Sequence, residues 1–124
     1  MSAPRIAAIA VLALRIAYGA GLLVAPDRLT ARWLGPAATG GPVQVPLRGL
    51  GAREVVLHGG ALAAALADAP LRGWLAASIA GDLTDIAATA AGRRDLPAGA
   101  LPKTAAVAGL SALVSAAVAV AVER

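Results

Sequence analysis

The chain has 124 residues, of which 59% are hydrophobic and only 15% are charged, and it contains no cysteine. A soluble domain usually carries about 25% charged residues, and a domain of this size cannot bury so large an apolar fraction. This composition excludes a disordered chain, a disulfide scaffold and a cysteine metal site, and it disfavours a soluble fold. The net charge is +4, but the basic residues are scattered along the chain and only 2% of the residues are aromatic, which disfavours a nucleic-acid partner.

Four long apolar stretches follow one another along the chain, at residues 5–25, 46–67, 71–92 and 103–122. A helix of about 20 residues rises about 30 Å, which matches the hydrocarbon core of a bilayer. Barrel strands would be shorter and would alternate in polarity. The sequence therefore predicts an all-α fold, a single domain built as a four-transmembrane-helix bundle, with membrane lipid around it in the bacterial cytoplasmic (inner) membrane.

The three connectors differ in length and charge. Residues 26–46 form the longest connector, in which Trp33 and Leu34 indicate a short interfacial helix. Residues 68–70 are so few that the second and third stretches are expected to be an antiparallel neighbouring pair. Basic residues are more frequent in and beside the first and third connectors, which favours a cytoplasmic location for both.

Charged side chains inside the apolar stretches are the most informative residues. A charge at the centre of a membrane helix costs roughly 2.5–3.5 kcal/mol on an insertion scale, so such residues usually face the bundle interior, pair with one another and mark function. Spacing by about one helical turn places polar residues of the same stretch on one helical face. The third stretch has four such residues, which are Ser78, Asp82, Asp85 and Thr89. The second stretch has Glu54 and His58, and the first has Arg15 and Tyr18. Arg53 points away from Glu54 and is expected to serve a flank or another helix.

If these groups meet, their charges do not cancel. Two arginines face three carboxylates, and a low-dielectric site disfavours the remaining negative charge. One carboxyl group or His58 is therefore expected to hold a proton. We expect Asp82 or Asp85 to act as general acid, with the other carboxylate, Glu54 or His58 as base. Substrate binding is assigned to three further residues, Arg15, Arg53 and Tyr18.

These charged residues have two further interpretations: a purely structural role, which stays open, and a metal site, which is disfavoured. The charges can form an ion network that only fixes helix register. A metal site is disfavoured, because the chain has one histidine and the arginines already neutralise the carboxylates. No metal and no cofactor is expected.

Three motifs carry a resemblance to a known group of proteins. They are Arg15-x-x-Tyr18-Gly19 with the following Ala25-Pro26-Asp27-Arg28, then Arg48-Gly-x-Gly-x-Arg53-Glu54, and Gly81-Asp82-x-x-Asp85. Together they resemble a family of small four-helix integral membrane proteins of high-GC actinobacteria, largely of unknown function. The resemblance implies the fold and a bacterial membrane location, and it supplies no substrate.

The sequence favours intramembrane acid–base catalysis on a small lipophilic substrate, with isomerisation, cyclisation or epoxide and ring opening as the reaction. A proton-coupled transporter would use the same titratable residues as a relay. It would need a homo-oligomer, because four short helices enclose little pathway. A non-catalytic partner in a larger membrane complex is the third hypothesis, so the assignment as an enzyme is left open.

Overall fold

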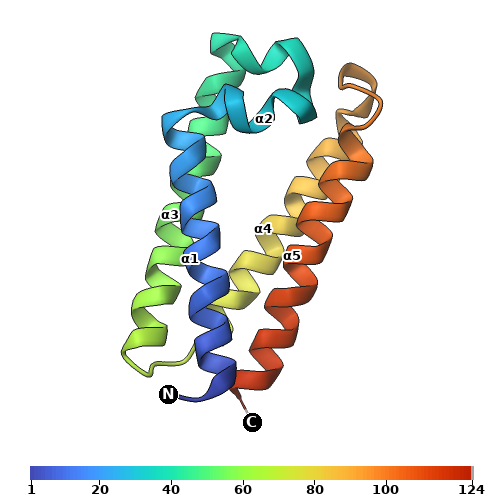
Figure 1. Cartoon of the computed structure of the whole chain (residues 1–124). Helices are drawn as coiled ribbons and strands as arrows, with labels where there is room; N and C mark the ends of the chain where they lie inside the picture. Colours follow the sequence, from blue (N-terminus) through green and yellow to red (C-terminus); the bar gives the residue numbers. More distant parts are fainter. Residues whose placement is uncertain (124) are drawn as a thin grey trace.

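The computed structural model describes residues 1–123, which are almost entirely helical and contain no strand (Figure 1). This confirms the all-α class. The elements in chain order are α1 (Ala3–Val24), α2 (Pro26–Leu34), the 3-10 helix η1 (Gly35–Thr39), α3 (Gly41–Leu66), α4 (Arg72–Ala91), the 3-10 helix η2 (Arg93–Asp95) and α5 (Ala100–Val122).

The long helices form two pairs. Helix α1 packs most closely against α3, and α4 packs most closely against α5. The pairs meet at the end that holds both termini and diverge toward the end that holds α2 (Figure 1). The sequence predicts that residues 46–67 and 71–92 are an antiparallel neighbouring pair; the helices α3 and α4 that contain them are in contact, but each packs more closely against another helix.

Glycine explains why α1 and α3 approach so closely. A Cβ atom added to Gly51 would lie 2.6 Å from the carbonyl oxygen of Gly19, and one added to Gly19 would lie 2.7 Å from the carbonyl oxygen of Gly51. The two backbones therefore touch at a point where any side chain would separate them. Small residues allow this kind of contact between membrane helices.

Arginine side chains fasten both ends of the α1–α3 pair. Arg5 donates a hydrogen bond to the carbonyl oxygen of Ala65 at 2.9 Å, and Arg48 donates one to the carbonyl oxygen of Leu23 at 2.6 Å. Each guanidinium thus satisfies a carbonyl near the C-terminus of the other helix, where helices lack intrahelical donors.

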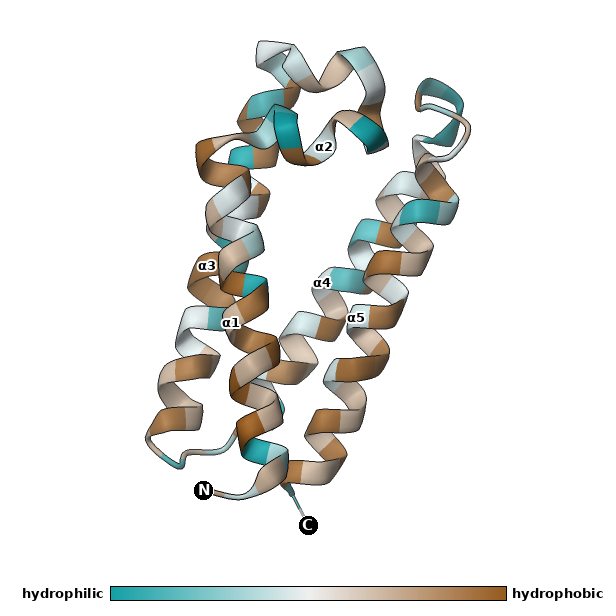
Figure 2. Ribbon diagram, viewed as in Figure 1, coloured by the Kyte–Doolittle hydropathy of each residue, from teal (hydrophilic) through white to brown (hydrophobic). Residues whose placement is uncertain are grey.

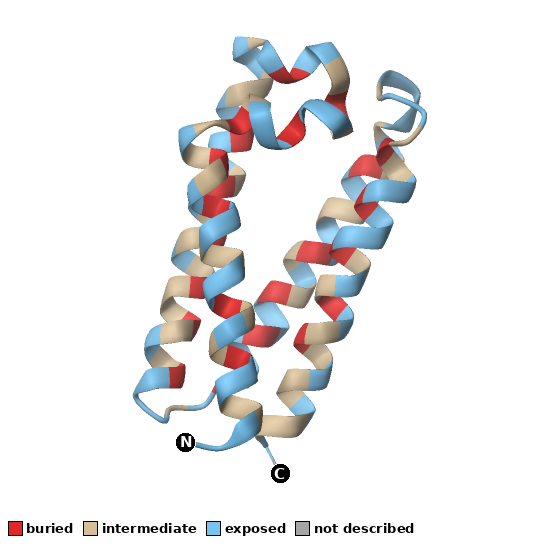
Figure 3. Cartoon of the chain, in the orientation of Figure 1, coloured by how far each residue is buried: buried red, intermediate tan, exposed pale blue. Residues whose placement is uncertain are grey.

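Two apolar clusters hold the two ends of the molecule. The cluster near the termini joins α1, α3 and the start of α4, and α5 packs against it; its buried members are Ala8, Leu12, Ala61, Ala65, Leu71 and Leu75. The cluster near α2 joins α2, η1 and α3 through Leu34, Ala38 and Leu47. In Figure 3 the buried positions of α1 and α3 face the partner helix, whereas the outer faces are exposed.

The helix that contains the second apolar stretch is longer than expected. It begins at Gly41, so Pro46 lies inside it. Pro46 lies just past the first turn, and it forgoes only one intrahelical hydrogen bond there. The predicted short helix around Trp33 and Leu34 is the nine-residue α2, which starts at Pro26.

Helices α1 and α5 are long and apolar enough to cross a membrane. Only 22% of the most apolar window of each is buried inside the molecule, although the core helix of a soluble protein would be mostly buried. Hydrophobic residues cover most turns of the long helices, and hydrophilic residues are concentrated at α2 and at the turn before α5 (Figure 2). These observations give weak support to membrane association.

Candidate functional site

Arg15 joins two carboxylates from two other helices. Its Nη1 and Nη2 atoms donate to the two carboxylate oxygens of Asp82 at 2.8 and 2.6 Å. Its Nε and Nη2 atoms donate to Glu54 at 3.1 and 3.3 Å. Both carboxylate side chains are only 3% exposed. A guanidinium suits this position, because its fork of donors can serve two planar carboxylates at once.

Arg53 extends the network toward the surface. Its Nη2 and Nη1 atoms donate to the carboxylate of Asp85 at 2.8 and 3.2 Å, and Nη2 also lies 3.4 Å from Glu54 Oε1. The side chains of Arg53 and Asp85 are 35% and 29% exposed. The expectation that Arg53 serves another helix agrees with its contact to Asp85 on α4, but the arginine also reaches its sequence neighbour Glu54.

His58 approaches Glu54 at Oε2, whereas Arg53 approaches it at Oε1. Its Nδ1 atom is 2.8 Å from the carbonyl oxygen of Glu54 and 3.3 Å from Glu54 Oε2. A carbonyl oxygen only accepts hydrogen bonds, so Nδ1 carries a proton. Nε2 is 2.9 Å from Ser78 Oγ, so in a neutral ring the Ser78 hydroxyl donates to Nε2. His58 is buried, and it holds Glu54 in place through these contacts.

The five charged groups alternate in sign along the network. The order is Asp82, Arg15, Glu54, Arg53, Asp85, which carries a net charge of −1 when His58 is neutral. The two aspartates do not share one arginine. Each has its own guanidinium, so the mutual repulsion expected between carboxyls one turn apart is largely relieved.

A cavity of about 420 Å³ lies directly over this network, between the two helix pairs. We call it the central cleft. All five α-helices contribute to its wall; the lining polar groups are Arg15, Tyr18, Arg32, Glu54, Asp82, Asp85, Thr89, Lys103 and Thr104, and the larger apolar ones are Leu29, Trp33, Leu50 and Val107. Its floor is therefore ionic and its walls are largely apolar, which is typical of a site for a small organic molecule.

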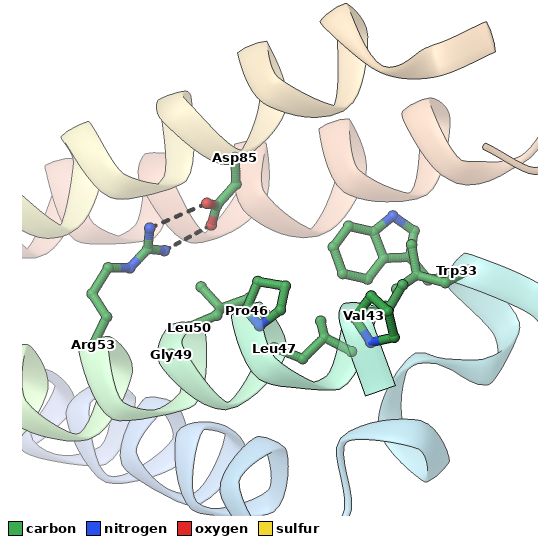
Figure 4. Close-up of a pocket in the computed structure, with 10 residues that line it drawn as sticks. Trp33, Val43, Pro46, Leu47, Gly49, Leu50, Arg53 and Asp85 are labelled. Atoms are coloured by element: carbon green, nitrogen blue, oxygen red, sulfur yellow. Dashed lines mark hydrogen bonds and ion pairs between the residues drawn. The ribbon is translucent and has the colours of Figure 1, made fainter. Parts of the chain in front are cut away.

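A second cavity of about 490 Å³ adjoins the central cleft and is more open. Trp33, Leu50 and Asp85 line both cavities. Figure 4 shows this second cavity along α3, with the two hydrogen bonds between Arg53 and Asp85 at one end and Trp33 at the other. Asp85 is therefore the carboxylate that a molecule in either cavity would meet.

The structure brings six of the seven predicted site residues into contact and adds Tyr18 at the cleft wall. Arg15, Arg53, Glu54, Asp82 and Asp85 form the network, and His58 contacts Glu54. Tyr18 lines the cleft and is 42% exposed. Among residues 1–123, its side chain makes no hydrogen bond.

Several residues of the cleft wall have no counterpart among the predicted site residues. The sequence places Trp33 in an interfacial helix, yet it lines both cavities. On the sequence alone, Arg32 and Lys103 count only toward the orientation in the membrane. In the structure, both line the cleft on the side of α2. No local spacing pattern links α2 with the start of α5, so these residues have no signal in the sequence. Ser78 does have one, because it shares a helical face with Asp82.

Within residues 1–123, no three His, Asp or Glu side chains are grouped so that they could hold a metal ion. The arginines occupy the positions between the carboxylates, where a cation would bind.

Comparison of the chain with protein-family models, with characterised proteins and with solved structures gives no match. The chemistry of the site therefore rests on its own residues.

Proposed function

We propose that this protein is a multi-pass membrane protein of the bacterial inner membrane in which α1, α3, α4 and α5 all cross the bilayer. Each of these helices has at least 20 residues and so reaches about 30 Å. Each also exposes a large apolar side chain: Leu14 is 73% exposed, Val56 74%, Leu83 55% and Leu113 70%. The charges in the middle of α3 and α4 pair with one another or with Arg15; they are those of Arg53, Glu54, Asp82 and Asp85. The resemblance to the actinobacterial four-helix family is consistent with this proposal.

We further propose that the central cleft performs acid–base catalysis on a small lipophilic substrate. The observation that carries this proposal is the cleft itself, which has apolar walls and an ionic floor that keeps one unbalanced negative charge. A network that only fixed helix register would not need a cavity above it. The reactions that fit are isomerisation, cyclisation or ring opening, which begin with a proton transfer.

Asp85 is the best candidate for the acid. It stands at the end of the alternating network, so adding a proton to it leaves two arginines paired with two carboxylates. Asp82 is the other end, but it is buried and its two bonds to Arg15 are shorter. Asp85 is also the more exposed of the two, so water can return its proton.

The remaining groups have supporting roles in this proposal. Arg53 stabilises the Asp85 carboxylate that forms when its proton moves to the substrate. Glu54 also lines the cleft, and it is placed to accept the proton that the substrate loses when the product forms. His58 does not line the cleft and acts through Glu54, as a positioning residue and not as the catalytic base expected from the sequence.

A transporter remains the second candidate, because the two helix pairs diverge at one end and meet at the other (Figure 1). This is the arrangement of a carrier open to one side. Proton flux into vesicles that contain the protein would support transport over catalysis.

The test of catalysis uses membranes with the protein, incubated in D₂O and extracted for mass spectrometry. Protonation of an alkene by an acid that exchanges with solvent places deuterium on carbon in the product. We expect a lipophilic isomer that carries deuterium with the natural chain, a loss of at least about 100-fold with Asp85→Asn, and normal formation with Asp95→Asn. Asp95 is exposed and lines neither cavity. Equal product from both variants would overturn the assignment of Asp85, and no protein-dependent product would overturn catalysis.

A further inference from the structure

The two ends of the central cleft differ in charge. The floor contains Arg15, Glu54, Asp82 and Asp85 and is negative overall with Arg53. The other end, on the side of α2, contains Arg32 and Lys103, and we call it the mouth. Asp82 and Thr89 both line the cleft and are seven residues apart on α4, which places floor and mouth about 10 Å apart.

The two basic side chains at the mouth have donors to spare. Lys103 uses one of its three protons in a 2.7 Å hydrogen bond to the carbonyl oxygen of Arg32, which ties the start of α5 to α2. Within residues 1–123, the Arg32 guanidinium has no hydrogen-bond or ion-pair partner. The side chain of Trp33 lies beside them at the cleft, and its buried Nε1 atom likewise has no acceptor in this part of the chain.

From this polarity we infer that the molecule bound in the central cleft is a single-chain amphiphile with an anionic phosphate or carboxylate headgroup. This inference rests on the proposed function and names its substrate class. The headgroup lies at Arg32 and Lys103, at the end of the cleft that Trp33 also lines.

The chain of the amphiphile then extends along Leu29, Leu50 and Val107 to the floor. The opposite orientation is unfavourable, because the floor would place the headgroup beside carboxylates whose arginines are already paired. Asp85 and Thr89 are four residues apart on α4, or about 6 Å along the helix. The carbon that receives the proton from Asp85 is therefore separated from the headgroup by several bonds of the chain, and the headgroup is retained in the product.

The inference is tested by binding, independently of turnover. Trp33 and Trp74 are the two tryptophans, and Trp74 packs on Gly60 of α3, away from the cleft. In a Trp74→Phe background, the fluorescence of Trp33 therefore reports on the cleft. The protein is placed in nanodiscs of zwitterionic lipid and titrated with decyl phosphate, decanol or inorganic phosphate.

We expect decyl phosphate to bind at least about tenfold more tightly than decanol, because two charge-assisted contacts are gained. Inorganic phosphate is expected to bind weakly. The double variant Arg32→Gln, Lys103→Gln should abolish the preference, and Arg94→Gln should keep it. Arg94 is a basic residue at the same end of the molecule that lines neither cavity.

Other outcomes separate the two proposals. Equal binding of decyl phosphate and decanol would overturn the headgroup inference and leave the cleft as a binding site. Inorganic phosphate, or anionic lipid added to the discs, could change the Trp33 fluorescence as much as decyl phosphate does. Either result would show that the mouth binds a headgroup alone, and it would overturn the assignment of a single-chain amphiphile. No response to any probe would contradict both the inference and the cleft as a substrate site.

Discussion

Arg15 is the residue on which the polar network depends most. Among the arginines of residues 1–123, it alone is bonded to two carboxylates that are almost completely buried, and these come from α3 and α4. It therefore also joins the two helix pairs through the middle of the molecule. Its loss would leave Asp82 without its guanidinium and Glu54 with the contacts to Arg53 and His58 at 3.4 and 3.3 Å.

The first prediction is that Arg15→Gln strongly destabilises the fold. Removing one partner of a buried ion pair typically costs about 3–5 kcal/mol, because the other charge stays buried and unpaired. Asp82→Asn should cost less, since Arg15 keeps Glu54. Thermal unfolding of the detergent-solubilised variants measures both.

An exposed ion pair of the same chain provides the control. Arg72 and Glu123 are 3.7 Å apart, with side chains 81% and 45% exposed. Arg72→Gln should leave the melting temperature unchanged within error, because exposed pairs contribute little. A similar loss for Arg15→Gln and Arg72→Gln would mean that the buried network does not hold the helices together.

At the scale of the elements, the contact between α1 and α3 positions the site. Gly19 lies one turn from Arg15, and Gly51 lies three residues before Glu54. The short distance between the two backbones brings the Arg15 guanidinium within reach of the Glu54 carboxylate. A wider spacing would lengthen bonds that are already 3.1 and 3.3 Å.

The second prediction concerns this contact. Gly51→Ala should destabilise the protein by about 1–3 kcal/mol, because the added methyl group meets backbone atoms that have no room to move. It should also weaken decyl phosphate binding, since the floor of the cleft is displaced. Unfolding and the Trp33 titration measure the two effects.

Gly49→Ala is the matched control, because it lies on the same helix and its added Cβ meets no atom within 4 Å. Alanine also favours a helix over glycine by about 1 kcal/mol, so this variant should be neutral or slightly stabilised. Equal destabilisation by both variants would rule out the close backbone contact as the cause.

At the scale of the whole molecule, the divergence of the two helix pairs creates the cleft. The pairs are joined near the termini by an apolar cluster, whereas the second, smaller cluster holds α2 and η1 against α3. Between the clusters, the ion network is the main link. The side of α2 has more basic residues than the end with the termini. Under the proposed membrane topology, the positive-inside tendency therefore predicts that this side faces the cytoplasm.

The third prediction tests the proposed four spans. The chain lacks cysteine, so single cysteines can be introduced without background. Thr39→Cys and Ala98→Cys should react with an impermeant maleimide from the cytoplasmic side, and Ser2→Cys and Glu123→Cys from the opposite side. All four positions are exposed.

Labelling of right-side-out and inside-out vesicles distinguishes the two sides. Reaction of Thr39→Cys and Ser2→Cys from the same side would contradict a membrane-spanning α1. Reaction of Thr39→Cys and Ala98→Cys from different sides would contradict the bundle of four spans.

The helices and the inward-facing charges follow from the amino-acid sequence alone. Helical periodicity fixes which side chains share a face, so it places Ser78, Asp82 and Asp85 on one stripe. The cost of a charge in an apolar surrounding then requires these side chains to find partners. The all-α class and the meeting of Arg15 with carboxylates of two other helices are consequences of these local rules.

The pairing of the helices, the carboxylate that each arginine binds and the position of the cleft depend on tertiary contacts. The pairing of α1 with α3 depends on two glycines that meet across helices, and spacing along one chain contains no record of that contact. The same reason hides Arg32 and Lys103, which become neighbours only because α2 folds back toward the start of α5. Local periodicity sets the direction of each side chain, but the distance between two helices is set by the atoms that meet between them.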